Sequence, residues 1–343
     1  MEIWDAYNSD FEIIDGMSLI RGEESSIPAG VYHLVCHILV KHKDGTFLLM
    51  RRDLRKAYPG MWEATAGGSA LKGETPIECA FRELKEETGI TATTLEEIRR
   101  FVWDPTHCVH VEYLCETDCD KDSVILQDGE TIEYKWAAAE EICKMGSDEL
   151  LSEGTRRYIS KTFGKMKLVF PTIEYKEKAI DFINEFYEYG SAINGSGSLD
   201  WFLKESTYEE WLVKVMRYID IANIPKPGVP ALTYFYVREE DDNIIGMVNI
   251  RLALNDFLRK EGGHIGYCVR PTERRKYYAT DMLTRAIDVC GAIGINEVLL
   301  SCDKDNAASA GVIRKCDGLL KDELYSETFG ENIQMYAIRL YSK

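Results

Sequence analysis

Along the first half of the chain, hydrophobic and polar residues alternate in short runs, which is the pattern of half-buried β-strands. Two such runs, 31–40 and 46–51, are separated by the turn Lys43-Asp44-Gly45 and therefore predict a hairpin. Further strands are predicted at 98–103, 109–115 and 132–136. Hydrophobic positions spaced three and four residues apart predict helices at 137–144 and 148–162.

The second half of the chain alternates strand patterns with helical patterns. Strands are predicted at 231–237, 244–251, 264–269, 297–302 and 333–340, after a short apolar run at 168–170. Helices are predicted at 173–187, 208–221, 276–290 and 307–315, with a proline-rich loop at 223–230. This order implies an α/β (α+β) protein with mixed sheets flanked by helices. Because the helical pattern breaks at 163–166, we expect one domain at 1–163 and a second at 168–343.

Length and charge narrow the class of protein. A chain of 343 residues suits two domains of about 100–200 residues each. Its net charge of −17 argues against nucleic-acid partners and against anionic membranes. No window is apolar enough for a membrane span, and the first residues lack the basic flank and apolar core of a secretion signal. The ten cysteines include no Cys-x-x-Cys pair, so we expect reduced thiols and a cytoplasmic protein.

The strongest chemical signal lies at residues 68–90, which read GSALKGETPIECAFRELKEETGI. Thr75 and Pro76 suit the start of a helix and Gly89 its end. Three glutamates share one arc of that helix because their spacing is i, i+3 and i+4: Glu83, Glu86 and Glu87. Like charges crowded in this way are destabilising unless a cation lies between them, and oxygen ligands favour Mg²⁺ or Mn²⁺. The segment therefore predicts a divalent metal site suited to phosphoryl chemistry.

The same segment matches the complete Nudix box, Gly68-x5-Glu74-x7-Arg82-Glu83-Leu84-x-Glu86-Glu87-x-Gly89-Ile90, and thus resembles the Nudix hydrolases. The resemblance implies an α/β/α sandwich that hydrolyses a nucleoside diphosphate linked to another group. It also implies metal binding by Glu83, Glu86, Glu87 and the carbonyl of Gly67 or Gly68, supported by Arg82 and Glu74. By the same resemblance, Glu83, Glu86 and a further glutamate would act in catalysis. Our candidate for the further glutamate is Glu130, and Glu133 is the alternative.

Three alternatives to hydrolysis stay open. The glutamates are also compatible with a solvated acidic face, or with a domain that senses a nucleotide without turnover and regulates the second domain. The upstream segment 58–68 resembles the branch near the isopentenyl diphosphate isomerases, which makes isomerase activity the third alternative. Those enzymes carry a cysteine and a histidine beside the first box glycine, whereas Gly67 and Ser69 stand there in this chain. The paired histidines of the first half, His33 with His37 and His107 with His110, are expected to be structural.

A second chemical signal spans residues 263–283, where a predicted strand runs through a basic turn into a predicted helix. A helix N-terminus presents unpaired N–H groups and a positive dipole end, and consecutive basic residues add to that field. An anion such as a diphosphate would fit there.

This segment looks like motif A of the GNAT acetyltransferases, with Arg274-x-x-Tyr277-x-Ala279 in place of R-x-x-G-x-G/A. Tyr277 therefore replaces a glycine. The resemblance implies a mixed sheet flanked by helices, acetyl-CoA as co-substrate, and an amine acceptor. The residues implied in cofactor binding are Val269, Arg274, Arg275, Lys276, Tyr277, Tyr278, Ala279, Asn306 and Ser309.

The acceptor side of this second site is less defined. The tyrosine that often serves as general acid would fall at Ile313, so the acid is left unassigned, with Tyr325 or a water as substitutes. The acidic residues near Asp200 favour a cationic acceptor. Aromatic residues in the same region form either core or pocket wall: Trp201, Phe202, Tyr208 and Trp211. Together the motifs predict a bifunctional cytoplasmic enzyme that uses Mg²⁺ or Mn²⁺ and acetyl-CoA, acts on a small-molecule diphosphate and an amine, and has no nucleic-acid or membrane partner. A homodimer is left open.

Overall fold

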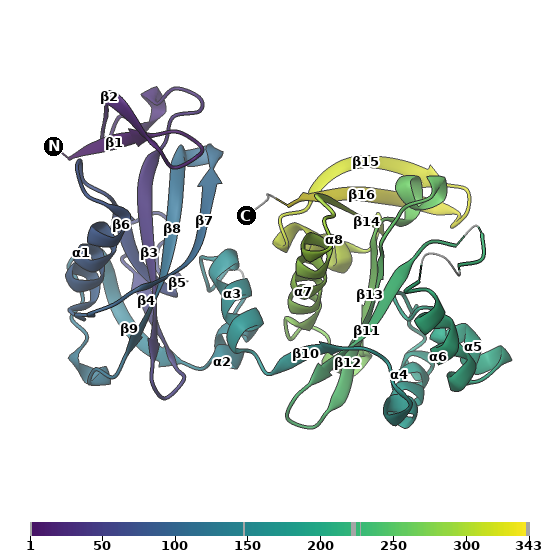
Figure 1. Cartoon of the computed structure of the whole chain (residues 1–343). Coiled ribbons are helices and arrows are strands. Elements are labelled where there is room, and N and C mark those ends of the chain that lie inside the picture. Colours follow the sequence, from purple (N-terminus) through teal and green to yellow (C-terminus); the bar gives the residue numbers. More distant parts are fainter. Residues whose placement is uncertain (1, 147, 221–223, 227, 341–343) are drawn as a thin grey trace. The chain divides into compact units, whose positions relative to one another are not determined.

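The chain divides into two compact units, Met1–Ile159 and Ser160–Lys343, in a computed structural model that describes residues 2–146, 148–220, 224–226 and 228–340 (Figure 1). Each unit is considered by itself. The predicted domain bounds at 163 and 168 stay a prediction.

The first unit is built on one mixed sheet. Its strands are β3 (His33–His42), β4 (Phe47–Arg52), β5 (Trp62–Glu63), β6 (Thr65–Ser69), β7 (Glu96–Trp103), β8 (Cys108–Thr117) and β9 (Thr131–Ala137). The order is β5-β4-β3-β8-β7, with β6 paired to β3 and β9 to β4. Only β3 and β8 pair in parallel. A separate antiparallel pair, β1 (Ile3–Tyr7) and β2 (Ile13–Ile20), precedes this sheet.

Helix α1 (Pro76–Thr88) begins and ends where the sequence predicts. Thr75 and Glu78 form a capping box, and Gly89 ends the helix with a positive φ of 72°. The hydrophobic side of the helix packs on β3 and β6, where Ala80 and Leu84 are fully buried. Its acidic arc is therefore held in a fixed position beside β6.

Two shorter helices complete the first unit. They are α2 (Ala139–Lys144) and α3 (Glu153–Phe163), the second of which crosses the division between the units. Figure 1 shows α1 and α2 on opposite sides of the sheet, which is an α/β/α arrangement and confirms the predicted fold class.

The second unit contains two antiparallel sheets. The first has the order β10-β11-β12-β13, formed by Met166–Val169, Ala231–Arg238, Asn243–Arg251 and Ile265–Val269. The second has the order β14-β16-β15, formed by Glu297–Asp303, Glu331–Arg339 and Leu319–Ser326. Side chains that alternate along the strands of the first sheet reach two cores, one on each face. Phe235 and Met247 belong to one core, whereas Tyr236 and Val248 belong to the other.

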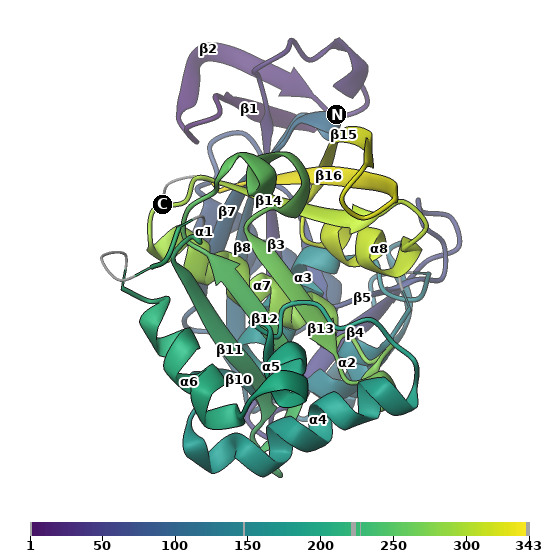
Figure 2. The same ribbon diagram turned by 90° about the vertical axis from the view of Figure 1, so that its right-hand side faces the viewer.

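Helices cover both faces of that first sheet. One face carries α4 (Lys176–Glu188), α5 (Leu199–Glu205) and α6 (Tyr208–Arg217), which lie in front of the sheet in Figure 2. The other face carries α7 (Tyr278–Ala292), which packs on β12 and β13 and contacts α8 (Ala307–Lys315). The flanking helices predicted for this unit are thus present, and its described strand pairs are all antiparallel, where the sequence predicted a mixed sheet.

Some predicted bounds were wrong. The helix expected at 148–162 begins only at Glu153, and the helix expected at 208–221 ends at Arg217, with residue 221 outside the described part of the chain. The proline-rich loop at 223–230 is described only in part, because residues 223 and 227 lie outside it.

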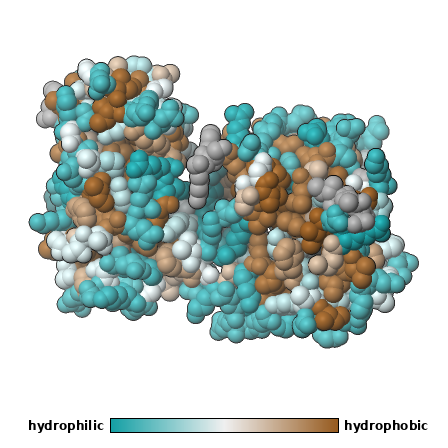
Figure 3. All heavy atoms as spheres, in the orientation of Figure 1, coloured by the Kyte–Doolittle hydropathy of each residue, from teal (hydrophilic) through white to brown (hydrophobic). Residues whose placement is uncertain are grey.

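On the face that Figure 3 draws, both units carry hydrophilic and hydrophobic residues side by side. Hydrophilic residues cover much of the face drawn in Figure 3. Among the described residues, no helix combines the length and the hydrophobicity that crossing a bilayer requires.

Candidate active sites

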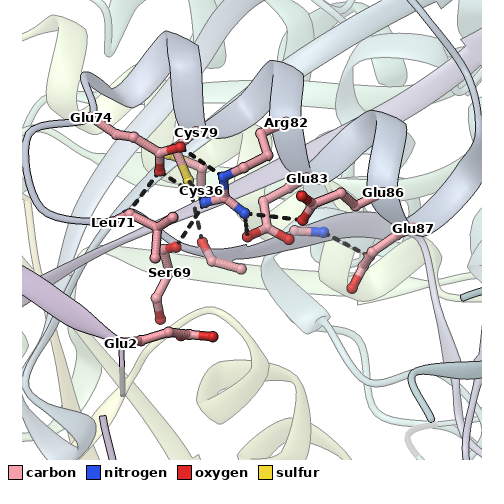
Figure 4. Close-up of polar contacts among 12 residues, drawn as sticks. Glu2, Cys36, Ser69, Leu71, Glu74, Cys79, Arg82, Glu83, Glu86 and Glu87 are labelled. Carbon is pink, nitrogen blue, oxygen red and sulfur yellow. Dashed lines mark hydrogen bonds and ion pairs between the residues drawn. The ribbon is translucent and has the colours of Figure 1, made fainter. Parts of the chain in front are cut away.

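The guanidinium group of Arg82 organises the acidic arc of α1 (Figure 4). It forms two hydrogen bonds with Glu74, from Nε to Oε1 at 2.7 Å and from Nη2 to Oε2 at 2.8 Å. Its Nη1 donates to Glu83 Oε1 at 2.6 Å and to Glu86 Oε2 at 3.1 Å. A last bond, from Nη2 to the carbonyl of Ser69 at 3.1 Å, ties the helix to the end of β6. Arg82 and Glu74 are therefore positioned to orient the glutamates, as the sequence predicts.

Burial distinguishes the glutamates from one another. Glu87 is 9% exposed, and its Oε2 accepts a hydrogen bond from the backbone N–H of Gly67 at 2.9 Å. Removal of water from its carboxylate raises the pKa of Glu87 to about 7. Burial also raises the pKa of Glu83, although Arg82 acts in the opposite direction. Glu86 is half exposed.

The two glycines at the end of β6 allow this packing. A Cβ at Gly68 would lie 2.6 Å from Oε1 of Glu83, so the backbone of residue 68 runs directly against that carboxylate. A Cβ at Gly67 would lie 2.1 Å from the carbonyl oxygen of Cys36 on the paired strand β3. Any side chain at either position would move its neighbours.

These donors match the predicted divalent ion in their chemistry. Carboxylate oxygens and a backbone carbonyl are hard ligands, and burying carboxylates side by side costs free energy that a cation would offset. Among the residues that the structure describes, no group of three or more His, Cys, Asp or Glu side chains is arranged as a closed metal site. The arc is instead held by Arg82, which binds two of its three glutamates.

The two candidates for the additional glutamate have different surroundings. Glu130 forms an ion pair with Lys56, whose ammonium group is partly withdrawn from water. Burial lowers the pKa of Lys56, and the charge of Glu87 opposes this, so Lys56 lies within electrostatic reach of the acidic arc. Glu133 is instead paired with Arg51, at 2.9 Å, on side chains that are about half exposed. The surroundings favour Glu130 over Glu133.

Glu63 was not among the predicted residues. Its carboxylate pairs with Arg52 at 2.6 Å, and its charge contributes to raising the pKa of Glu87. It is therefore a further acidic group of this site. Its place in the sequence, four residues before Gly67, was the only signal that pointed to it.

The histidines of the first unit have structural surroundings, as expected. His37 Nε2 lies 3.0 Å from His110 Nδ1, and the ring of Phe101 stacks on His110. Burial lowers the pKa of His110 to about 3. His33 is buried and stacks on Trp4 with ring centroids 4.2 Å apart.

In the second unit, the two sheets are linked where β13 begins. Gly263 bridges Leu300, and the backbone N–H of His264 donates to the carbonyl of Leu299 at 2.6 Å. The imidazole Nδ1 of His264 accepts the N–H of Leu299 at 2.9 Å, so this side chain serves the link between the sheets. No other pairing of β13 with β14 occurs among the described strands. The adjacent edges of the two sheets therefore separate beyond this link.

The basic turn before α7 keeps the backbone shape of a glycine-containing turn. Tyr277, at the position of the usual glycine, has a left-handed φ of 70°, and Arg275 has φ 62°. Such conformations cost a non-glycine residue roughly 1 kcal/mol. Lys315 Nζ lies 5.8 Å from the centre of the Tyr277 ring. Tyr278 and Ala279 follow in the first turn of α7, both partly buried.

The basic residues of this turn have different partners. Arg274 Nε donates to the carbonyl of Val269 at 3.2 Å, and its Nη1 donates to the hydroxyl of Ser191 at 3.2 Å. Lys276 pairs with Glu273 at 2.7 Å. Arg274 is thereby fixed beside the end of β13, whereas Lys276 is neutralised locally.

The N-terminus of α8 lies near β13. Asn306 caps this helix by accepting the N–H of Ser309 at 3.0 Å, and the hydroxyl of Ser309 lies 3.3 Å from that of Tyr267 on β13. Tyr267 was not predicted, and burial raises its pKa above the usual value of a tyrosine, which keeps its hydroxyl protonated at neutral pH. Ile313 is buried in the core and carries no acidic group, whereas Tyr325 is 60% exposed.

Comparisons with known proteins agree with both motifs. Residues 31–160 match the NUDIX domain family and residues 184–318 match the acetyltransferase (GNAT) domain family. An uncharacterized Nudix hydrolase of Listeria monocytogenes is 42% identical over 91 residues, which are 26% of this chain and 52% of that protein. The uncharacterized Nudix hydrolase YfcD of Salmonella typhi is 32% identical over 139 residues, 40% of this chain and 73% of that protein.

The chain is also similar, at low sequence identity, to solved structures. RimL, a ribosomal L7/L12 alpha-N-protein acetyltransferase solved with coenzyme A, is 17% identical with a TM-score of 0.39, covering 51% of this chain and 94% of RimL. The chain spans about half the length of the Listeria relative.

The chain belongs to the Nudix hydrolase family, and its second half carries a GNAT acetyltransferase domain. The predicted family assignment is thereby confirmed.

Proposed function

We propose that the chain is a bifunctional enzyme. The first unit hydrolyses a nucleoside diphosphate-linked compound with Mg²⁺ or Mn²⁺, and the second transfers an acetyl group from acetyl-CoA to an amine. The observation that carries the first activity is the acidic arc of α1, complete in the sequence and packed against Gly68 and Arg82. None of the ten cysteines, all of which lie in the described part of the chain, is joined to another by a disulfide, which suits the cytoplasm.

In the first unit, Glu83, Glu86, Glu87 and the carbonyl of Gly68 would hold the ion. When bound, the ion supplies charge stabilisation for the diphosphate and lowers the pKa of water. Arg82 fixes the orientation of Glu83 and Glu86 by its two hydrogen bonds. Glu130, which forms an ion pair with Lys56, would accept a proton from the attacking water.

In the second unit, the diphosphate of acetyl-CoA would lie against the turn before α7. Arg274 and the first N–H groups of α7 supply positive charge and hydrogen-bond donors there. Val269, at the end of β13, and Asn306 and Ser309, at the start of α8, would contact the rest of the cofactor. The left-handed φ of Tyr277 supports this assignment, because the turn keeps its shape without the glycine.

Phosphate release tests the hydrolase. The wild type, Glu87→Gln and the control Glu96→Gln, at an exposed position on β7, are assayed on nucleoside diphosphate compounds with Mg²⁺ and with Mn²⁺. We expect Glu87→Gln to lower kcat at least 100-fold and Glu96→Gln to leave it unchanged. Turnover that is equal in all three proteins would refute the role of Glu87.

A nucleotide sensor is the second candidate. The observation that favours it is the engagement of Glu83 and Glu86 by Arg82, which leaves the arc without a closed metal site among the described residues. A sensor would show no turnover on any compound of the panel, while one of these compounds would change the rate of acetyl transfer. Isomerase activity has less support, since Gly67 and Ser69 stand where the isomerases carry a cysteine and a histidine.

A further inference from the structure

A polar cavity of about 400 Å³ lies in the second unit, between the loop that joins α4 to α5, helix α6, and the strands β11 and β12. Its lining includes Asn194, Asp200, Lys214, Asn249 and Arg251. The helices that border it are those in front of the sheet in Figure 2. None of its lining residues belongs to the turn before α7, so the cavity is separate from the proposed diphosphate site.

The loop that closes this cavity is in contact with β13. Gly195 has φ 73°, and a Cβ there would lie 2.2 Å from the carbonyl oxygen of Gly266. Gly266 in turn pairs with Asn249, which lines the cavity. Because β13 also borders the separation between the two sheets, the cavity adjoins the strand along which the acetyl donor is proposed to lie.

Arg251 is a largely buried cation of this cavity. Its Nη1 donates to the carbonyls of Gly262 and Gly263, both at 3.0 Å, and burial lowers its pKa. No ion pair joins Arg251 to a carboxylate among the described residues. The two carbonyls occupy only Nη1 of the guanidinium, and among the described residues no protein group accepts a hydrogen bond from its Nε or Nη2.

Lys214 is the second cation. Its Nζ donates to the carbonyl of Gly197 at 2.7 Å, and burial lowers its pKa, partly opposed by the charge of Asp200. No carboxylate lies within ion-pair distance of Lys214 among the residues described. Asp200 is the one acidic lining residue, and its carboxylate accepts a hydrogen bond from Ser196 at 2.7 Å.

Two partly buried cations and one carboxylate in the described lining leave an excess of positive charge. Withdrawing a charge from water without an opposite charge is costly, and a bound anion would offset that cost. A guanidinium presents donors in a planar fork that fits carboxylate and phosphate oxygens, and a lysine ammonium acts on the same groups as a point charge. Asp200 supplies the opposite charge that a protonated amine would need.

We propose that this cavity binds the acceptor of acetyl transfer, and that Arg251 and Lys214 select amines that carry a carboxylate or a phosphate close to the amino group. The inference rests on the proposed acetyltransferase function and replaces the sequence-based expectation of a purely cationic acceptor. In the transfer, the amine nitrogen bonds to the thioester carbonyl carbon and the C–S bond breaks. The proton lost by the nitrogen ends on the sulfur of coenzyme A.

The first arm of the test is kinetic. Release of the coenzyme A thiol is followed with glycine and glutamate as carboxylate amines, phosphoethanolamine as a phosphate amine, tyramine as a weakly hydrophobic amine without an anion, and spermidine as a polycation. We expect the amines of one anionic class to have a kcat/KM at least 10-fold above those of tyramine and spermidine. Whether this class is the carboxylates or the phosphate shows which anion the cavity binds. A preference for spermidine would overturn the proposal.

Variants assign the selection to the two cations. A lost charge-assisted bond of about 1.5–3 kcal/mol corresponds to a roughly 10- to 100-fold fall in kcat/KM for the anionic amine. Arg251→Met and Lys214→Met should show this fall, chiefly through KM, while Arg251→Lys retains part of the activity. Lys204→Met, on an exposed lysine of α5 outside the cavity, is the matched control and should be unchanged. Unchanged selectivity in both Arg251→Met and Lys214→Met, each folded by circular dichroism, would overturn the proposal.

A binding measurement tests the cavity independently of the acetyltransferase function. Calorimetric titration of the full chain with glycine and with inorganic phosphate reports anion binding whether or not acetyl transfer occurs. Binding that weakens in Arg251→Met and Lys214→Met, but not in Lys204→Met, supports the cavity even if no amine is acetylated. Absence of binding by the wild type, together with acetylation of tyramine, would overturn the cavity assignment and leave the transferase intact.

Discussion

Replacing either glycine at the end of β6 by alanine should give two different phenotypes, although the positions are adjacent. A Cβ at residue 68 meets only the carboxylate of Glu83, at 2.6 Å, whereas a Cβ at residue 67 meets the carbonyl oxygen of Cys36, at 2.1 Å. The first obstacle is the end of a side chain and can move. The second is the backbone of a fully paired central strand and cannot move without disturbing the sheet.

The size of each effect follows from these distances. Ordinary contacts of a Cβ begin at 3.4 Å, so Oε1 of Glu83 must retreat by about 0.8 Å in Gly68→Ala. A displacement of about 1 Å in a catalytic group costs on the order of 100-fold in rate. The cost in stability should stay near 1 kcal/mol, because a side chain absorbs the shift. In Gly67→Ala, overpacking against the backbone should cost about 3 kcal/mol.

The assay combines urea unfolding with phosphate release for the wild type and both variants. We expect Gly68→Ala to be folded and about 100-fold slower, and Gly67→Ala to unfold at a clearly lower urea concentration. Gly73→Ala is the control for a glycine with no neighbour within 4 Å, although its φ of 85° adds local strain. The reasoning is refuted if Gly68→Ala keeps full activity, or if it loses as much stability as Gly67→Ala.

Three further predictions concern other parts of the chain. Glu130→Gln should lower the rate of hydrolysis about 100-fold, whereas Glu133→Gln should change it less than 3-fold, because Glu130 is the one of the two that a lysine holds near the acidic arc. Phosphate release measures both rates, and equal losses in the two variants would contradict this. Asn306→Ala should lower the free energy of unfolding by about 1 kcal/mol through loss of the α8 cap, measured by denaturant titration, and an unchanged midpoint would count against it. Burial holds the pKa of His110 at about 3, below its unfolded value, so the stability that its neutral form contributes is present above pH 6.5 and is lost as the pH falls towards 3. The free energy of unfolding, measured at pH 5 and at pH 7, should therefore fall by up to about 2 kcal/mol at the lower pH. This loss should be absent in His110→Phe.

Elements with strong periodic patterns could be predicted from the sequence. Helix α1 has a cap, a proline at its first position and a terminal glycine, and each of these local signals agrees with the others. The same holds for the long central strands β3 and β8, whose hydrophobic runs are buried on both faces.

Several strands had no such signal. The short strand β5 has two residues, and β6 is rich in glycine, so neither shows an alternation of hydrophobic and polar positions. Strand β15 is almost entirely exposed, and its position is set by pairing with β16 rather than by burial. Tertiary pairing decides such elements, and a single sequence does not report it.

The residues of the acidic site on α1 also divide into those that the sequence predicts and those that only the fold brings together. The box identifies Arg82 and the three glutamates because they lie close together in the sequence. Lys56 and Glu63 come from the loop after β4 and from β5, and only the sheet brings them near α1. The cavity cations Lys214 and Arg251 are 37 positions apart and share no motif, so only the fold brings the two together.

Anomalous diffraction from crystals soaked in Mn²⁺ tests the central claim most directly. We expect a manganese peak bounded by the carboxylates of Glu83, Glu86 and Glu87 and by the carbonyl of Gly68, with Arg82 turned at least partly away from Glu86. In crystals of Glu87→Gln the peak should be weak or absent. A wild-type map without anomalous density beside α1, at an Mn²⁺ concentration that supports turnover, would contradict the account.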